Sequence, residues 1–260
     1  MDQTSEGASH PSPRHRVPDV SCQDCMLRRM RLFKPLDDDE LHYVAGLRDR
    51  QLSRPAGGRL LQPGRAGGFL YTLFSGWAFR SIRLADGSRQ ILEFLLPGDV
   101  FGLQVALLGD WDYEVTALTP VILCRLRAPS IDELCARFPA LNRALIHTLV
   151  EDKRRADSRL AVLGRALGPQ RIAHLMLELA ERLEQMGQLH DNGCAFPLRR
   201  RHLADATGLS GTHVNRSLIE LREKGMAHIA DERLTLLDRD GLVRFAGYTS
   251  FAPCVQRLIL

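Results

Sequence analysis

Apolar residues recur at steps of three and four along residues 139–164, which is the spacing of one face of a helix. The seam consists of Ile146, Leu149, Ala156, Leu160 and Leu163. Pro139 suits the first turn of such a helix. About 25 residues at about 1.5 Å each give a length of roughly 37 Å. A seam of this length predicts a dimerisation helix. The alternative is one side of a helix that packs into a core.

Residues 51–128 follow a different pattern, in which short apolar or alternating runs are separated by turn residues. Pro-Gly, Gly-Gly, Ser-Gly and Asp-Gly pairs recur at intervals of roughly 8–12 residues, which is typical of an antiparallel barrel or sandwich. Asp86-Gly87 lies between two such runs and predicts a tight hairpin. Short helices are expected on either side, over residues 37–47 and 131–138.

Helical periodicity returns after residue 164. Gly164 and Gly168-Pro169 are expected to break the long helix, and residues 171–186 predict another helix with one apolar face. The pair Asp191-Asn192 indicates a turn before a short strand. Beyond residue 225, two short strands about Asp231-Glu232 predict a wing, and residues 248–260 show no interpretable pattern.

The stretch 200–225 has the pattern of a helix-turn-helix. Ala204 allows two helices to approach, and Gly208 provides a residue that accepts positive φ at the turn. Ser210 can cap the second helix. Val214, Leu218 and Leu221 form an apolar stripe along it, and packing is expected to depend on Leu218 because its neighbour Ser217 is polar.

The opposite face of that second helix carries Thr212, His213 and Arg216, which are free to contact a partner. Residues 199–224 contain six Lys or Arg against three Asp or Glu. The pattern therefore favours a DNA-reading helix that enters the major groove. The alternative is an ordinary helical hairpin on a solvated surface.

A Cys-x2-Cys pair, Cys22 and Cys25, is followed at once by Arg28, Arg29 and Arg31. Two thiols at this spacing can reach one metal ion or each other. Nearby positive charge lowers a thiol pKa and raises its reactivity. The spacing supplies only half of a tetrahedral metal site, so metal binding, redox chemistry and an inert role all remain open.

Composition narrows the class of protein. Hydrophobic residues make up 45% and charged residues 25% of the 260 residues, as in ordinary globular proteins, and the net charge of +4 is mild. No apolar run approaches the roughly 20 residues of a membrane span, and no secretory pattern is present, so a cytoplasmic protein without membrane contact is expected. No nucleophile–base set indicates an enzyme.

The order of these parts resembles the Crp/Fnr family of bacterial transcription regulators. The resemblance covers residues 22–240 and is specific in three motifs: LLPGDVFGL, GRALGPQRIAHLMLELA and LADATGLSGTHVNRSLIELREKG. HVNR is most similar to the Fnr and FixK branches. The implied fold class is α+β: an N-terminal antiparallel β-roll of the cupin-like jelly-roll type, a long dimerisation helix and a C-terminal winged helix-turn-helix.

The resemblance also implies a division of the chain. Residues 1–21 form a disordered tail, and residues 22–135 a sensor β-roll domain that includes the N-terminal cysteine segment. Residues 136–166 form the dimerisation helix and hinge. Residues 167–245 form the DNA-binding domain, and residues 246–260 a C-terminal tail.

As implied by the family, the partners are a second copy of the chain, a palindromic operator in double-stranded DNA and RNA polymerase. Half-sites would lie about 34 Å apart. The DNA-contacting set is Thr212, His213, Arg216, Ser210, Arg199, Arg200 and Arg201. Arg216 would bond guanine O6 and N7, and the three consecutive arginines would contact phosphates. Many relatives carry Glu at the position of Thr212, so the family's base preference does not carry over to that position.

The family offers several switches. Nucleotide-binding members carry Glu where Leu103 follows Gly102, so no cyclic nucleotide is expected. Fnr-type members bind a 4Fe-4S cluster through four cysteines, and Cys22, Cys25 and Cys124 match three of these. Arg31 stands at the third N-terminal position, which leaves the fourth ligand unknown; Cys135 is the nearest spare cysteine. The alternatives are direct oxidation of the cysteine thiols and a FixK-like regulator without a bound sensor.

Overall fold

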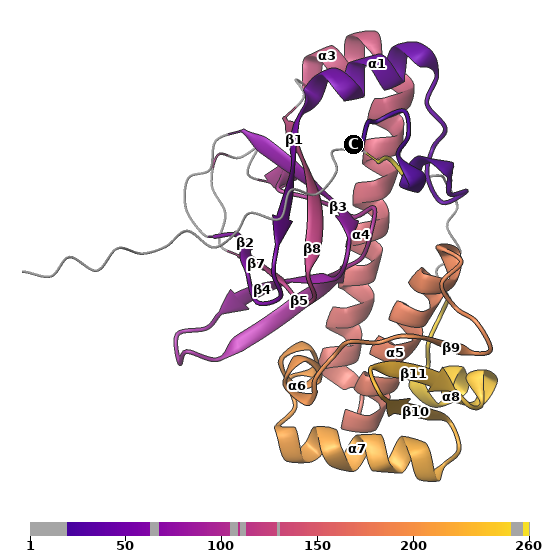
Figure 1. The fold of residues 1–260 in the computed structure, drawn as a ribbon. Helices are drawn as coiled ribbons and strands as arrows, with labels where there is room; N and C mark the ends of the chain where they lie inside the picture. The colour runs from indigo at the N-terminus through magenta and orange to yellow at the C-terminus, as the bar shows by residue number, and fades with distance from the viewer. Residues whose placement is uncertain are drawn as a thin grey trace, which may run out of the picture.

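The computed structural model describes residues 20–62, 68–104, 109, 113–128, 131–250 and 257–259. Of the tail expected over residues 1–21, all but Val20 and Ser21 lie outside this range. Figure 1 shows a β-roll beside one long helix, with the helix-turn-helix region at the lower end of that helix. The α+β fold class predicted from the sequence is confirmed.

The β-roll consists of two four-stranded antiparallel sheets. One has the strand order β1 (Arg48–Arg54), β8 (Val121–Arg127), β3 (Phe69–Ser75), β6 (Val100–Phe101). The other has the order β2 (Arg59–Leu61), β7 (Glu114–Ala117), β4 (Ala78–Arg83), β5 (Arg89–Leu95). The hairpin between β4 and β5 turns at Asp86-Gly87 as predicted, and Gly87 has φ +84°.

Alternation along β8 gives its two faces different environments. Val121 and Leu123 are buried with the apolar residues between the sheets. Successive side chains of a strand point to opposite faces. Cys124 therefore points to the outer face of its sheet, where its cross-strand neighbours are Gln51 and Thr72.

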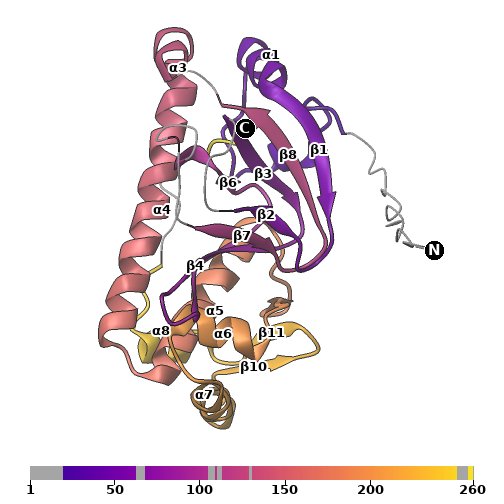
Figure 2. The same cartoon turned by 90° about the vertical axis from the view of Figure 1, so that its left-hand side faces the viewer.

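Helices cover the upper part of the β-roll. They are the 3-10 helix η1 (Met26–Arg29), α1 (Asp38–Leu47) and α3 (Ile131–Arg137). Asp37 and Glu40 form a reciprocal capping box at the start of α1, which explains why this short helix begins there. Figure 2 shows α4 running along the whole side of the β-roll down to the helix-turn-helix region.

The long helix α4 (Pro139–Arg165) begins at the proline that the sequence indicated. The helix ends at Arg165, one residue beyond the expected end at about Gly164, so Gly164 lies in its last turn. An exposed glycine costs a helix only about 1 kcal/mol. The chain turns at Ala166 and Leu167, which are both extended, and α5 (Gly168–Gln185) begins with Pro169 in its first turn.

The helix-turn-helix region follows α5 and contains β9 (Gly193–Ala195), α6 (Arg200–Thr207) and α7 (Gly211–Glu223). The predicted wing is formed by β10 (Ala227–Ala230) and β11 (Arg233–Leu236), with Asp231 and Glu232 at positive φ in the turn. A final helix, α8 (Arg239–Ala246), was not predicted from the sequence.

One hydrophobic cluster runs through both parts of the molecule. It contains Phe79 and Phe94 of the β-roll, Leu27 of the cysteine segment, Ile172 of α5 and Leu203 of α6. Shared burial of this kind fixes the two parts against each other. Within the described ranges, no helix has both the length and the apolar content that a membrane crossing requires.

Candidate DNA-binding surface and sensor site

The turn between α6 and α7 has the geometry that its sequence predicted. Gly208 has φ +66° and ends α6 in the left-handed conformation. The Ser210 hydroxyl accepts a hydrogen bond from the His213 backbone N–H at 3.3 Å and caps α7. The Arg171 guanidinium donates to the Thr207 carbonyl at 3.1 Å and ties α5 to the turn.

The buried side of α7 differs from the predicted stripe in one residue. Val214 and Leu221 are buried as expected, but Ser217 is also buried, whereas Leu218 is only partly so. The expectation that packing depends on Leu218 instead of Ser217 is therefore wrong. A Cβ atom placed on Gly168 would lie 3.4 Å from the Ser217 hydroxyl. Because the start of α5 approaches α7 this closely, a small residue suits the position.

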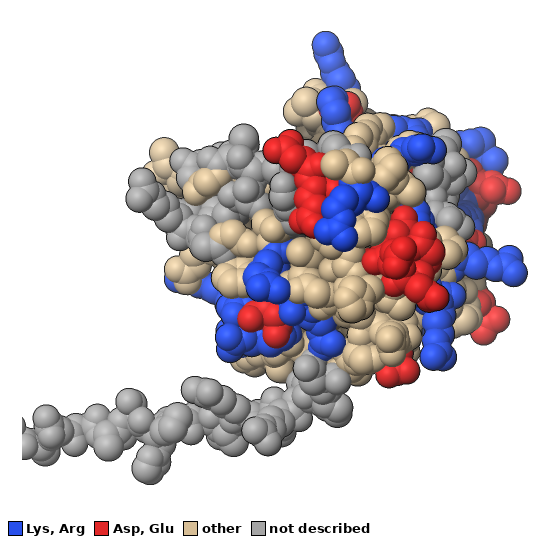
Figure 3. Space-filling model, turned by 90° about the horizontal axis from the view of Figure 1, so that it is seen from above, with Lys and Arg blue, Asp and Glu red and all other residues tan. Residues whose placement is uncertain are grey.

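The other side of α7 is open to solvent. Thr212, His213 and Arg216 are exposed, and Arg200 and Arg201 are exposed at the start of α6. Figures 1 and 2 place α7 at the lower end of the molecule, far from α1 and α3. The opposite end, seen in Figure 3, shows acidic and basic side chains interspersed. The exposed face of α7 can therefore approach a groove without obstruction from the β-roll.

The start of α6 lies in a positively charged environment. The pKa of His202 is lowered to about 4, first by burial and then by the charges of Arg201 and Arg89. Its Nδ1 accepts a hydrogen bond from the Arg199 backbone N–H at 3.1 Å. This neutral ring orders the first turn of α6, from which Arg199, Arg200 and Arg201 emerge.

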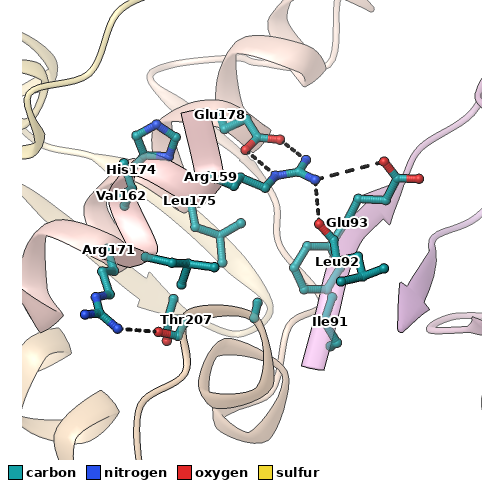
Figure 4. A pocket seen from close by; sticks show the side chains of 13 residues that line it. Ile91, Leu92, Glu93, Arg159, Val162, Arg171, His174, Leu175, Glu178 and Thr207 are labelled. Atoms are coloured by element: carbon teal, nitrogen blue, oxygen red, sulfur yellow. Dashed lines mark hydrogen bonds and ion pairs between the residues drawn. The ribbon is translucent and has the colours of Figure 1, made fainter. Parts of the chain in front are cut away.

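Buried ion pairs fix α5, which leads into the helix-turn-helix region, to α4 and the β-roll (Figure 4). Arg159 of α4 pairs with Glu178 of α5 and donates to the Leu92 carbonyl of β5 at 2.7 Å. Arg182 of α5 pairs with Asp99, which lies in the LLPGDVFGL motif. Sequence analysis missed this junction, because partners separated by 19 to 83 positions leave no local pattern.

A second contact holds α6 against the β4–β5 hairpin. The Arg89 guanidinium donates to Asp205 at 2.9 Å through Nε, and the Gln90 side chain donates to the Ala206 carbonyl at 3.3 Å. The Arg89 guanidinium also lies 4.8 Å from the centre of the Phe79 ring. The hairpin therefore reaches the helix-turn-helix directly.

The predicted dimerisation seam is exposed in the single chain. Ile146, Leu149 and Leu160 are 50%, 44% and 71% exposed, Ala156 is exposed and Leu163 is half-buried. Val150 adds a further apolar residue at 53% exposure. Apolar side chains along about one face of a long helix are typical of a surface that a partner covers.

The three cysteines that the sequence singled out line one small cavity. Cys22 lies in a turn where the Ser21 hydroxyl donates to Asp24 at 2.7 Å, and Cys25 immediately precedes η1. Gln51 joins both sides of the cavity, because it accepts from the Val20 backbone N–H at 3.2 Å and donates to the Cys124 sulfur at 3.5 Å.

Among the described residues, no fourth cysteine lines that cavity. Arg31 is exposed and does not line it. The side chain of Cys135 is outside the described part of the chain, and Cys194 is buried in β9. The other polar residues at the cavity are Ser21, Arg28, Arg48, Gln51 and Thr72. Among the described residues, no three His, Cys, Asp or Glu side chains are already arranged around a common metal position.

The surroundings of Cys124 change the pKa of its thiol. Burial raises the pKa of the Cys124 thiol, and the hydrogen bond from Gln51 and the charge of Arg48 act against that rise. A thiol with a raised pKa is a poor nucleophile but can still lose its proton to a metal. Three thiols are donors of the kind that a soft metal centre prefers. In the described residues they are not yet arranged around a common metal position.

Comparisons with known proteins agree with this description. Residues 170–245 match the family model of the Crp-like helix-turn-helix domain, and residues 51–138 match that of the cyclic nucleotide-binding domain. The transcriptional activator protein FnrL of Cereibacter sphaeroides is 27% identical over 84% of this chain and 89% of its own length. The nitrogen fixation regulation protein FixK of Bradyrhizobium diazoefficiens is 26% identical over 84% of this chain and 90% of its own.

Solved structures share the fold. FixK2 from Bradyrhizobium japonicum superposes with a TM-score of 0.68 at 24% identity, covering 77% of this chain and 98% of that one. The CRP family transcriptional regulator TTHB099 from Thermus thermophilus gives 0.61 at 27% identity over 76% and 97%.

A β-roll, a long helix and a winged helix-turn-helix with an open recognition face define a DNA-binding transcription regulator and not an enzyme. The two domain matches and the relatives support a regulator of the Crp/Fnr type, similar to the branch that includes Fnr and FixK.

Proposed function

We propose that this regulator binds a palindromic operator as a homodimer and that oxygen or redox state controls the binding through Cys22, Cys25 and Cys124. The observation that carries the proposal is the convergence of these three cysteines on one cavity. Cys124 lies about a hundred positions after Cys22 and Cys25 in the sequence. A thiol-lined cavity in the β-roll domain would supply the chemical input for a regulator whose output is DNA binding.

The DNA contacts follow from the exposed faces of α6 and α7. We infer that Arg216 bonds a guanine and that Thr212 and His213 contact neighbouring bases. Ser210 at the cap and Arg199, Arg200 and Arg201 are assigned to the phosphate backbone. Two such surfaces related by a two-fold axis fit half-sites about 34 Å apart. The protein would work in the cytoplasm, where operator DNA and RNA polymerase, its expected partner, are found.

The exposed seam of α4 supports the dimer. Ile146, Leu149 and Leu160 expose apolar surface that an identical helix would cover. Ala156 and Leu163 continue this face toward the helix-turn-helix region. Pairing along α4 would place both copies of α7 at the same end of the assembly.

We further propose that Cys22, Cys25 and Cys124 hold a 4Fe-4S cluster, with a fourth ligand that is not a cysteine of the cavity. When bound, such a cluster supplies oxygen-sensitive redox chemistry. The chain's own part is to bring three thiols together and to keep them partly shielded from solvent. Arg28 and Arg48 at the same cavity offset the negative charge of the thiolates.

The test combines anaerobic metal analysis with operator binding before and after exposure to air. The proposal expects a brown protein with about four irons per chain and a change in operator affinity in air. Cys22→Ser should lose the iron, whereas Cys194→Ser, at a cysteine in β9, should keep it. A colourless, iron-free anaerobic preparation would exclude the cluster.

Direct thiol sensing is the second candidate, because Cys22 and Cys25 are free thiols at a cavity that Arg28 also lines. It expects peroxide to change the operator affinity of metal-free protein, and Cys22→Ser to abolish that change. A FixK-like regulator without a sensor would instead bind operator equally in every cysteine variant and in air.

A further inference from the structure

The chain returns to its own N-terminal segment after the helix-turn-helix region. Residues 257–259, here called the terminal strap, lie beside the segment that follows the cysteines. The Arg257 backbone N–H donates to the Leu32 carbonyl at 2.9 Å, and the Arg257 carbonyl accepts from Lys34 at 2.8 Å. These bonds form a parallel β-bridge between Phe33 and Arg257. The strap is therefore part of the sensor end of the molecule, although it follows the DNA-binding region in sequence.

The strap also contacts the long helix and the cysteine cavity. The Leu258 backbone N–H donates to the Thr148 hydroxyl of α4 at 3.1 Å. Ile259 is 2% exposed and forms part of the cavity wall with Cys22, Cys25 and Cys124. The Ile259 carbonyl accepts from the Arg28 guanidinium at 3.4 Å.

The side chain of Arg257 reaches the junction with α5. It donates to Asp99 at 2.9 Å, and this carboxylate is also the partner of Arg182. The Arg257 and Asp99 side chains are 8% and 6% exposed, so the pair is shielded from water. Glu151 and Asp152 of α4 lie 3.6 Å and 3.5 Å from the same guanidinium.

Phe33 strengthens this connection. Its ring packs on Gly98, where an added Cβ atom would lie 2.1 Å from the ring. Gly98 has φ +92° and precedes Asp99. Because the ring leaves no room here, a shift of the cysteine segment must move either Phe33 or the turn that holds Asp99.

We propose that the terminal strap couples the cysteine cavity to the DNA-binding region. The strap closes one wall of the cavity, anchors to the long helix through Thr148, and shares Asp99 with Arg182 of α5. A rearrangement around Cys22 and Cys25 would then alter the Asp99 pairing and the seating of α5 on the β-roll. That the strap closes the cavity is argued from the contacts alone. That it passes a change at the cysteines on to the DNA-binding region rests on the proposed redox function.

The first experiment measures the alkylation rates of Cys22, Cys25 and Cys124 by iodoacetamide in reduced, metal-free, full-length protein, resolved by mass spectrometry. Two variants weaken the strap: a chain that ends at residue 256, and Thr148→Val, which removes one acceptor and leaves all charges in place. Arg239→Gln is the control, because it breaks an exposed pair with Glu184 far from the cavity.

Both strap variants should be alkylated faster, by about tenfold for the shortened chain, because the cavity opens when its wall loses these hydrogen bonds. The control should match the original protein. Alkylation at the original rate in both strap variants would overturn the proposal.

The second experiment compares operator affinity in the reduced and the oxidised state. The strap variants should still bind operator, but the ratio between the two states should fall toward one, whereas Arg239→Gln should keep the original ratio. If both strap variants kept the original ratio of operator affinities between the reduced and oxidised states, the coupling would be overturned. If the original protein shows no redox response, the proposed redox function fails, and the alkylation rates alone decide whether the strap closes the cavity.

Discussion

Arg216 is exposed on the open face of α7, two residues after Val214, whose buried side chain anchors the helix. Arg216→Lys keeps the positive charge but loses the two parallel N–H groups that bond guanine. Discrimination at one base pair should fall by about 1–3 kcal/mol. Fluorescence anisotropy on the operator and on a copy with that guanine replaced measures the difference.

Arg222→Lys on the same helix is the matched control, because Arg222 is exposed in the last turn of α7. It should bind both DNAs with the original discrimination. If Arg216→Lys weakened both DNAs equally, Arg216 would contact phosphate and not a base.

His202 gives the folded protein a measurable pH dependence. Its pKa is lowered from 6.5 to about 4, so the unfolded chain takes up a proton first as the pH falls. Stability from this group is complete above about pH 6.5 and is lost between that value and about pH 4. The loss is on the order of 3 kcal/mol across the window.

His202→Asn can still accept the Arg199 N–H but does not titrate. Urea unfolding at several pH values should therefore give a flatter profile for the variant between about pH 6.5 and about pH 4. Parallel profiles for the two proteins would show that folding does not lower the pKa of His202 and would contradict the assignment.

At the scale of elements, the α4 seam makes a prediction about assembly. Leu160 is 71% exposed in the single chain, and a two-fold dimer would bury two copies of it. Leu160→Lys should weaken the dimer by about 3–6 kcal/mol, taking about 1.5–3 kcal/mol for each buried leucine. Sedimentation equilibrium over a concentration series measures the dissociation constant.

Leu84→Lys serves as the control, since Leu84 is 51% exposed beside the β4–β5 turn and away from α4. The Leu84→Lys protein should have the same dimer dissociation constant as the original protein. Equal weakening by both changes would assign the effect to added charge and not to the seam.

Elements with a local pattern were predictable, and the others were not. Periodicity and Pro139 placed α4, and Asp86-Gly87 placed the hairpin, because each depends on neighbours in sequence. Helix α8 was missed because it is only eight residues long and has Gly241 near its start, where Asp238 caps it. The terminal strap has no periodic pattern at all, since its partners are Phe33, Thr148 and Asp99.

For the candidate site too, features with a local sequence pattern were predictable and contacts between distant residues were not. The cysteines were identifiable by spacing and resemblance, but their shared cavity required the N-terminal segment to lie across β8. Likewise, Arg159 and Arg182 showed no functional pattern until their partners in the β-roll were known.

At the scale of the whole molecule, Arg159 is expected to control how the two parts sit together. Arg159→Met would leave Glu178 buried without its charge partner, which should cost about 3–5 kcal/mol of stability. Arg159 also holds the Leu92 carbonyl of β5, so the helix-turn-helix region should separate from the β-roll. Thermal unfolding and small-angle scattering measure the two effects.

Lys153→Met is the control on the same helix, because its pair with Asp157 is exposed and worth at most about 1 kcal/mol. If Arg159→Met behaved like this control, the junction would not depend on the Arg159 pair. A double change, Arg159→Met with Glu178→Leu, should recover much of the stability because no charge remains buried.

The continuous hydrophobic cluster limits how this protein can be engineered. Chimeric biosensors are made by grafting the sensing half of one regulator onto the DNA-binding half of another. Here a graft at residue 166 would cut through side chains that pack on each other, such as Phe79 against His202. A working chimera would have to bring both sides of that boundary from the same parent, including the last residues of the chain.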